Sequence, residues 1–317
     1  MDRNAKSIGL LGTFGIVGEA FKIIHFKAKL LGNITLVFIL PLVLVNLVFG
    51  IIVQTHVAEI IFSKTTGELK LLILQLTELL VLNAVYLLLS YALLMPSMAA
   101  VVYTVATVDT GNNKPSFAGV MKLVPAVWKR MMITSLWYFI ISFMISMAFG
   151  FAVCFLAVGF LLFGKSYVIV FYAALIVWFV VLFLVSVYLG IVWKVATVVS
   201  VMEEDYYGLE GMKKSRRLLE GKRATAWVVT ISYMVINGLV GHAALKGYMH
   251  LEGLWAKIAF GTGCVVMEGL VALMWMLTQS VLYFVCKAYH GESIDGNLGE
   301  YQATDNKDTE SLEPLNI

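Results

Sequence analysis

The sequence predicts an all-α, polytopic membrane protein, a bundle of six transmembrane helices with amphipathic helices at the membrane surface. Hydrophobic residues make up 60% of the 317 residues and charged residues only 14%, and the mean hydropathy is +0.88. A soluble domain has a very different balance. Apolar stretches long enough to cross a bilayer recur along the chain. They lie at about 30–54, 79–105, 131–158, 166–193, 224–245 and 258–285.

Residues 1–29 are expected to form a helix at the cytosolic membrane surface. Apolar residues recur at spacings of four and three from Leu10 to Ile24, which is typical of an amphipathic helix. Three lysines fall between positions 22 and 29, before the first long apolar run. This segment is therefore too charged to be a cleavable signal peptide.

The first two spans are expected to form a hairpin. Pro41 lies inside the first of them and predicts a kink, because proline has no N–H and its ring clashes with the preceding turn. Asn46 and Asn83 fall toward the same end of this hairpin. We expect them to hydrogen-bond to each other, a contact that stabilises membrane helix pairs by about 0.6 kcal/mol.

The third span carries a stripe of small side chains that repeats every four residues. Small residues at this spacing let two helices approach closely. Packing within the bundle is one interpretation, and self-association of two chains is the other. The stripe consists of Ser142, Ser146, Gly150 and Cys154.

The densest run of charge lies between the fourth and fifth spans, at residues 201–223. Asp205 suits an N-cap and Gly221 suits the left-handed residue after a helix end, so Tyr206–Glu220 is predicted to be one short helix. Its acids precede its bases, as the helix dipole favours. Glu203 is one of those acids.

This short helix is a candidate contact for lipid or for a protein partner. On one side Leu209, Met212, Ser215 and Leu219 recur at helical spacing, and bases flank them. On an anionic leaflet each base would contribute about 1 kcal/mol of binding free energy. A solvated charged helix that only links two spans is the alternative. The bases are Lys213, Lys214, Arg216, Arg217, Lys222 and Arg223.

The distribution of Lys and Arg predicts the orientation. Of the 23 such residues, 18 lie in the N-terminal segment, the second and fourth connections and the tail. The positive-inside rule then places both termini in the cytosol, with the protein in an endomembrane or the plasma membrane. The tail, residues 286–317, is acidic and poor in large apolar residues, so it is expected to be disordered.

A weak internal repeat is also present. Phe21-Lys22, Met121-Lys122 and Met212-Lys213 each precede a basic cluster and then a span. One interpretation is three units, each an interfacial helix followed by a transmembrane hairpin. Chance similarity among basic helices beside membranes is the other.

The central run resembles a known motif. Glu203-Glu204, then Gly208, Met212-Lys213, Ser215 and Gly221 are similar to the cytosolic motif of a plant family of six-span membrane proteins of unassigned role. That family is often labelled polyadenylate-binding-protein-binding, and the resemblance covers nearly the whole chain. Locally the motif also resembles the membrane domain of bacterial glycerophosphodiester phosphodiesterases. No enzymatic activity carries over, because the bacterial catalytic part is a separate barrel and no segment here is polar and long enough to form one.

Glu268 is the one acid inside a predicted span. It lies about ten residues, or roughly 15 Å, from the outer end of the sixth span, where a charge costs at least ~2.5 kcal/mol. We expect it to be protonated, paired or in contact with water, with Asn237 as its candidate partner and Gln279 as a second. A proton or substrate site of a transporter and a neutral carboxyl hydrogen-bonded between spans are both consistent with it.

The sequence indicates no enzyme. The five histidines are scattered without ligand-pair spacing, no nucleophile motif is present, and the three cysteines form neither a disulfide framework nor a zinc motif. We therefore expect no catalytic residue, no cofactor and no metal. Nucleic-acid binding is not expected either, since the bases adjoin the membrane.

Two functions remain. The leading prediction is a non-enzymatic membrane organiser or scaffold whose cytosolic helices contact lipid, including anionic headgroups, or a protein partner. The alternative is a transporter or channel for a small molecule or lipid that uses Glu268. A broken helix or a water-filled cavity at Glu268 would favour transport, and a dry, well-packed bundle with a basic cytosolic face would favour the organiser.

Overall fold

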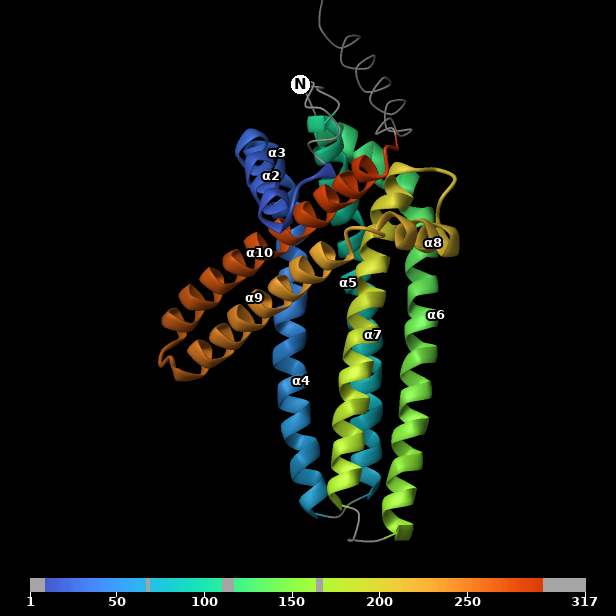
Figure 1. Cartoon of the computed structure of the whole chain (residues 1–317). Helices are drawn as coiled ribbons and strands as arrows, with labels where there is room; N and C mark the ends of the chain where they lie inside the picture. Colours follow the sequence, from blue (N-terminus) through green and yellow to red (C-terminus); the bar gives the residue numbers. More distant parts are fainter. Residues whose placement is uncertain (1–8, 67–68, 110–116, 164–167, 293–317) are drawn as a thin grey trace, which may run out of the picture.

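The computed structural model describes residues 9–66, 69–109, 117–163 and 168–292 (Figure 1). The elements are α2 (Thr13–Phe26), α3 (Ala28–Ile34), the π-helical turn η1 (Thr35–Ile39), α4 (Leu40–Thr66), α5 (Leu69–Asp109), α6 (Phe117–Phe163), α7 (Val168–Met202), α8 (Gly208–Leu218), α9 (Arg223–His250) and α10 (Leu254–Tyr289). The predicted acidic tail beyond residue 292 lies outside the described residues.

Six helical segments within these ranges are long and apolar enough to cross a membrane, which confirms the predicted all-α, six-span class. Each overlaps one predicted span. They are Ala28–Val57, Ile73–Val108, Gly119–Leu156, Ile169–Met202, Arg223–Ala244 and Leu254–Tyr289.

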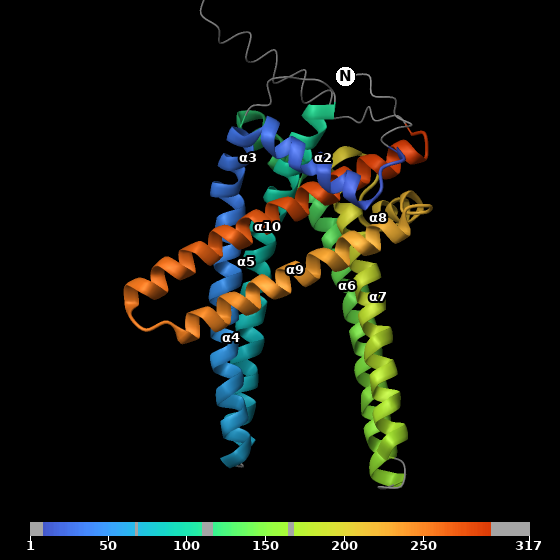
Figure 2. The same ribbon diagram turned by 60° about the vertical axis from the view of Figure 1, so that its left-hand side comes forward.

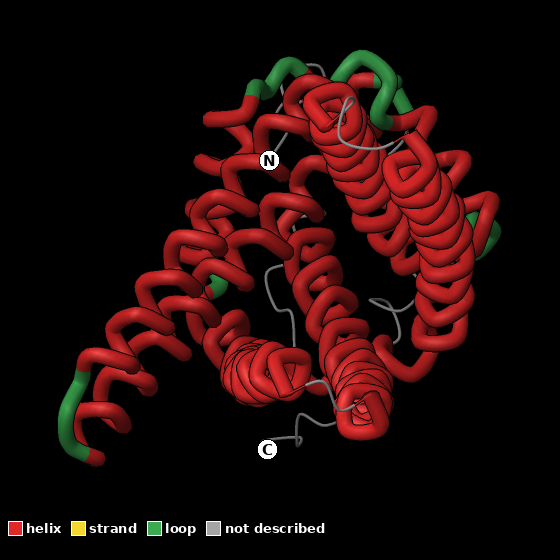
Figure 3. The backbone as a smooth tube through the Cα atoms, turned by 90° about the horizontal axis from the view of Figure 1, so that it is seen from below, coloured by secondary structure: helices red, strands yellow, loops and turns green. Residues whose placement is uncertain are grey.

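The spans form three hairpins, of which two lie side by side and the third crosses them at an angle. Helices α4 and α5 make one hairpin and α6 and α7 a second. The axes of these four helices are nearly parallel (Figure 1), and the two hairpins separate toward their tips (Figure 2). The third hairpin, α9 and α10, lies obliquely across them and ends part-way along their length (Figures 1 and 2). Seen from below, the two steep hairpins are distinct pairs rather than one four-helix bundle (Figure 3).

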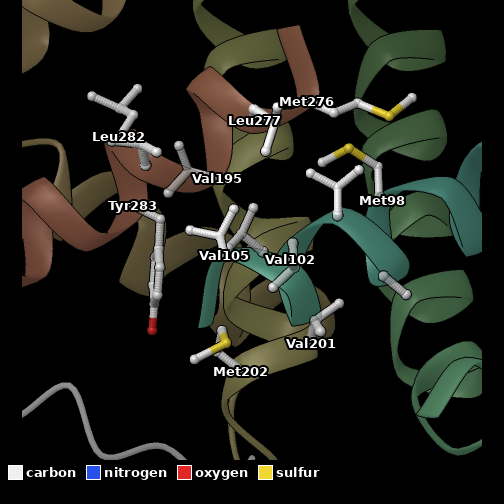
Figure 4. Close-up of a cluster of buried hydrophobic side chains, with 14 of the residues drawn as sticks. Met98, Val102, Val105, Val195, Val201, Met202, Met276, Leu277, Leu282 and Tyr283 are labelled. Carbon is white, nitrogen blue, oxygen red and sulfur yellow. The ribbon is translucent and has the colours of Figure 1, made fainter. Parts of the chain in front are cut away.

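The hydrophobic core lies at one end of the molecule, where all the helices meet. Three segments there have nearly every side chain buried: Met95–Thr107 of α5, Val195–Met202 of α7 and Met276–Ala288 of α10. Figure 4 shows their side chains interdigitating. We call these segments, together with α8 and residues 119–131 of α6, the packed layer. Helix α10 is its centre, since it contacts α2, α4, α5, α7, α8 and α9.

The remaining lengths of the four steep helices, which we call the shafts, are packed differently. They comprise residues 44–57, 73–89, 136–156 and 169–185, and no side chain that the structure describes in them is fully buried. Large apolar side chains point outward, such as Phe155 at 81% and Ile169 at 85% exposure. This is the surface of a helix pair that faces hydrocarbon rather than a protein interior.

The start of the first span is locally wider than an α-helix. At η1 the N–H of Leu40 bonds to the carbonyl of Thr35, five residues back. Pro41 follows at once and has no N–H with which to bond the preceding turn. The π-helical turn therefore takes up the disturbance that the proline causes.

Two local predictions need correction. Asn46 does not bond to Asn83; its Oδ1 accepts a hydrogen bond of 3.1 Å from the hydroxyl of Tyr86, one turn further along α5, and Asn83 is exposed. The tail does not begin at Cys286, because α10 continues to Tyr289 and buries Cys286 and Lys287 in the packed layer.

The predicted three-unit organisation can be compared with the observed order of elements. Helices α2 and α3 precede the α4–α5 hairpin, and α8 precedes the α9–α10 hairpin. Before the second hairpin the corresponding segment, residues 117–130, is the first part of α6 itself. Each copy of the sequence repeat thus lies in a helical segment that precedes a hairpin. This segment is separate from the hairpin in the first and third cases and continuous with α6 in the second.

Candidate functional site

Helix α8, which carries the basic residues singled out by the sequence, is anchored on α6 at its first turn. It begins at Gly208, two residues later than predicted, and no side chain of the preceding residue caps it. The N–H of Gly208 instead donates to Oγ1 of Thr134, at 2.8 Å. The prediction of Asp205 as N-cap is therefore wrong, because a hydroxyl from a helix 74 residues away satisfies the same backbone group.

Glu203, at the end of α7, is the centre of a charge cluster that joins α7, α8 and α10. Its Oε1 accepts hydrogen bonds from the hydroxyl of Tyr283 at 2.8 Å and from Nζ of Lys287 at 3.1 Å. Its Oε2 accepts one from Lys214 of α8. Lys214 also lies 3.4 Å from the carboxylate of Glu292. Two ammonium groups thus face two carboxylates, which is how charges are tolerated away from water.

The environment of this cluster shifts the pKa values of Glu203 and Lys214. Burial on its own would raise the pKa of Glu203, but hydrogen bonds from Lys214 and Tyr283 and the charge of Lys287 lower it below its usual value. Burial on its own would lower the pKa of Lys214, but its bonds to Glu203 and Glu292 raise it. Both groups therefore stay ionised across the physiological pH range.

The other end of α8 is held by the end of α10. Nε2 of His290 lies 3.1 Å from the carbonyl oxygens of both Leu218 and Glu220, at the carboxyl end of the helix. Gly221 has a φ of +85°, as predicted for the residue after the helix. The ring of Tyr289 fills the space where a Cβ of Gly221 would stand.

The six candidate bases divide into two groups. Lys214 belongs to the Glu203 cluster, Lys222 donates to the carbonyl of Leu11 at 3.3 Å, and Arg223 pairs with Glu220 at 2.9 Å. Lys214 and Lys222 thus join separate parts of the structure, whereas Arg223 makes a local, solvent-exposed pair that stabilises little. Their structural role was hidden in the sequence, where they look like the other bases of the run.

Lys213, Arg216 and Arg217 form the second group, which we call the basic face of α8. All three side chains are exposed, and none makes a hydrogen bond or ion pair with another residue that the structure describes. The opposite side of α8 packs against the rest of the packed layer, where Met212, Ser215 and Leu218 are buried. The basic face is therefore held in place and is available to an outside partner.

Glu268 lies in a crevice between α4 and the oblique hairpin. The cavity has a volume of about 220 Å³. It is lined by Asn46, Leu47, Gly50, Ile51, Gly241, Ala244, Phe260, Gly261, Cys264 and Glu268. Glu268 is half-buried, and no hydrogen bond or ion pair joins it to any of the described residues. The single carboxyl therefore faces walls that are mostly apolar.

The predicted partners of Glu268 do not reach it. A Cβ on Gly241 would stand 3.5 Å from Oε1 of Glu268, so the carboxyl is level with Gly241 and not with Asn237, which is exposed one turn away. The stacking of Tyr233 on Trp275, with centroids 4.0 Å apart, sets this register of the hairpin. The second candidate, Gln279, lies eleven residues along α10, roughly 16 Å away, buried in the packed layer with both amide atoms unpartnered.

The small-residue stripe of the third span does not pack within the chain. Ser146, Gly150 and Cys154 are exposed and Ser142 is half-buried, and among the described residues no atom from outside its own helical turn lies within 4 Å of the position that a Cβ of Gly150 would take. Packing inside the bundle, the first interpretation of this stripe, is therefore wrong. Self-association remains a prediction.

Several residues of the site could not be found from the sequence pattern. Thr134 and Tyr283 lie within apolar stretches and Lys287 follows one, all far from the central run, and only folding brings them to α8 and Glu203. A weak signal was present, since Tyr283 and Lys287 are four residues apart on one helix face. Among the described residues no cluster of three or more metal-ligating side chains is found.

The comparisons with known proteins place the chain in a family. No curated protein and no solved structure matches it. A family model does match, over residues 1–301, nearly the full length of the chain. The chain thus belongs to the family described as Domain of unknown function DUF8558.

Proposed function

We propose that the protein is a non-enzymatic membrane organiser whose packed layer faces the cytosol and whose basic face on α8 contacts an anionic leaflet. The observation that carries this proposal is the division of α8: its apolar side is buried in the packed layer, while Lys213, Arg216 and Arg217 are exposed. A helix held in this way presents its charges without a cost of ordering on binding. Three bases near an anionic surface would contribute about 3 kcal/mol together.

A second surface, on helix α2, supports the same proposal. Helix α2 buries Ile16, Ala20 and Ile23 against the protein, whereas Phe14 and Phe21 on its other side are exposed at 94% and 59%. Exposed aromatic residues beside lysines are typical of helices that lie in a membrane interface. An acidic protein segment would be the corresponding partner in place of lipid.

The experiment measures the enrichment of phosphatidylserine around the full-length protein in mixed nanodiscs, by energy transfer from the protein to a labelled lipid. We expect Arg216→Gln with Arg217→Gln to lower this enrichment several-fold, and high salt to lower that of the wild type similarly. The matched control is Lys70→Gln with Lys246→Gln, which removes two exposed lysines elsewhere. Equal behaviour of the two double variants would refute the proposal.

Transport through Glu268 is the second candidate, favoured by the crevice around that carboxyl. The core argues against transport. On the side of the packed layer, α10 continues from the crevice into the buried segment Met276–Ala288, so a solute could reach Glu268 from that side only if the core opened. Solute and proton flux in liposomes, compared between the wild type and Glu268→Gln, separates the two functions. Flux that is lost in this variant would make the protein a transporter.

A further inference from the structure

The crevice around Glu268 has the dimensions of a lipid headgroup rather than of a whole lipid. Its volume is about 220 Å³, which is room for several water molecules or a small polar group. It lies between α4 and the oblique hairpin, and Ile51 of its lining is an apolar side chain that is itself exposed. A hydrocarbon tail attached to a bound headgroup could therefore remain in the bilayer.

Glycines create this space. A Cβ added at Gly50 or at Gly261 would meet no described atom from outside its own helical turn within 4 Å, and one added at Gly241 would stand 3.5 Å from Oε1 of Glu268. Larger residues at these positions would fit the backbone and fill the cavity. The empty volume thus results from three small residues on three helices.

The polar groups of the crevice suit a positively charged ligand. Glu268 supplies a carboxyl with no partner among the described residues, and no Lys or Arg lines the cavity. The Oδ1 of Asn46 is already occupied by Tyr86. The ring of Phe260 supplies an aromatic wall, and aromatic faces attract ammonium groups.

A carboxylate without a counter-charge is costly at membrane depth, and a ligand that brings the counter-charge removes that cost. We propose that this crevice is a binding site for a long-chain aliphatic amine, whose ammonium group pairs with Glu268 while its hydrocarbon tail extends into the bilayer. An uncharged amphiphile of the same length gains the apolar contacts but not the ion pair. The proposal concerns binding only and does not depend on the basic face of α8 or on transport.

The test uses photolabelling of the full-length protein in phosphatidylcholine nanodiscs. The probes are hexadecylamine and hexadecanol, each with a diazirine near the polar end, and mass spectrometry locates the label. We expect the amine to label residues around Gly261 and Cys264, and unlabelled hexadecylamine to compete with it. We expect Glu268→Gln to lower this labelling about tenfold or more, as the loss of a charged hydrogen bond predicts.

Two further variants make the result specific. Glu78→Gln makes the same chemical change at an exposed acid of α5 and should leave labelling unchanged. Gly261→Leu keeps the carboxyl but fills the cavity and should abolish labelling. The same elution profile in size-exclusion chromatography for all variants establishes that each is folded.

Three outcomes would overturn the proposal. Labelling of the crevice by hexadecanol that is as strong as labelling by the amine would mean that charge plays no part. Labelling could persist in Gly261→Leu, which would place the amine elsewhere. Absence of labelling by the amine in the wild type would show that the crevice holds no such ligand.

Discussion

The packed layer and the shafts are made of the same long helices and the same apolar residue types, yet they are organised in opposite ways. In α5, Leu80 and Leu88 of the shaft expose 71% and 75% of their surface, whereas Met98 and Val102 of the packed layer expose 1% or less. Exposed apolar area costs about 25 cal/mol per Å² in water and little in lipid. Full burial is therefore found only where the helices converge.

The polar contacts follow the same division. The shafts hold few of them, such as the bond from Tyr86 to Asn46. The packed layer is joined by the Glu203 cluster, the Thr134 cap and His290. The shafts therefore depend on the apolar character of their surface, which lipid solvates. The packed layer depends on contacts between particular residues, so single substitutions should disrupt this part of the molecule.

The largest effect is expected for Glu203→Ala. It leaves Lys287, whose side chain is 6% exposed, and Lys214 without their shared carboxylate. Removing one partner of a buried ion pair lowers the free energy of unfolding by about 3–5 kcal/mol. Equilibrium unfolding in mixed micelles measures the free energy, and Glu210→Ala, an exposed acid on α8, is the control. Equal stability of the two variants would contradict a structural role for the cluster.

The same cluster predicts a pH dependence. The lowered pKa of Glu203 means that its contribution is fully present above its unfolded pKa, about 4.3, and is lost as pH falls through the folded value. The raised pKa of Lys214 means that its contribution is fully present below about 10.4 and is lost as pH rises through the folded value. Unfolding measured at pH 7 and below pH 4.3 should show a steeper loss of stability for the wild type than for Glu203→Gln.

A smaller effect is expected for Gly221→Ala. Its φ of +85° is strained for any residue with a Cβ, and that Cβ would stand 2.5 Å from the ring of Tyr289, which must move. The cost is about 1–2 kcal/mol of unfolding free energy. Gly238→Ala, inside α9 with no atom within 4 Å of its Cβ position, serves as the control and should not destabilise. Thermal unfolding in nanodiscs compares the pair.

The smallest effect on the fold is expected for Gly150→Leu, on the exposed stripe of a shaft. No neighbour lies within 4 Å of its Cβ position, so stability should change by less than about 0.5 kcal/mol. If the stripe joins two chains, oxidative cross-linking through the exposed Cys154 should occur in the wild type and be lost in this variant. Cross-linking that persists unchanged would place any contact between chains elsewhere.

Much of the fold was predictable because the bilayer imposes simple rules. Length and apolar composition identify the six spans, each of which overlaps a helix of the structure. The glycine after the basic helix was predictable from its position, and Gly221 has the expected positive φ. The buried side of α8 was also indicated, since Met212, Ser215 and Leu219 of the predicted apolar side are buried.

The candidate site was only partly predictable. Glu268 could be recognised as unusual from the sequence, because a charge inside an apolar span is rare. Its surroundings could not, since the register of the α9–α10 hairpin places Gly241 and not Asn237 beside it. Likewise, Lys214 and Lys213 are adjacent in the sequence, but only the first reaches Glu203.

The sequence by itself determined where the chain crosses a membrane and which residues are charged, since both depend on local composition. Tertiary structure alone decided which of those charges are paired, that Thr134 caps α8, and that a crevice opens beside Glu268. The physical reason is range: hydrophobicity acts on each segment separately, whereas an ion pair or a cavity requires side chains from distant helices to meet within a few ångströms.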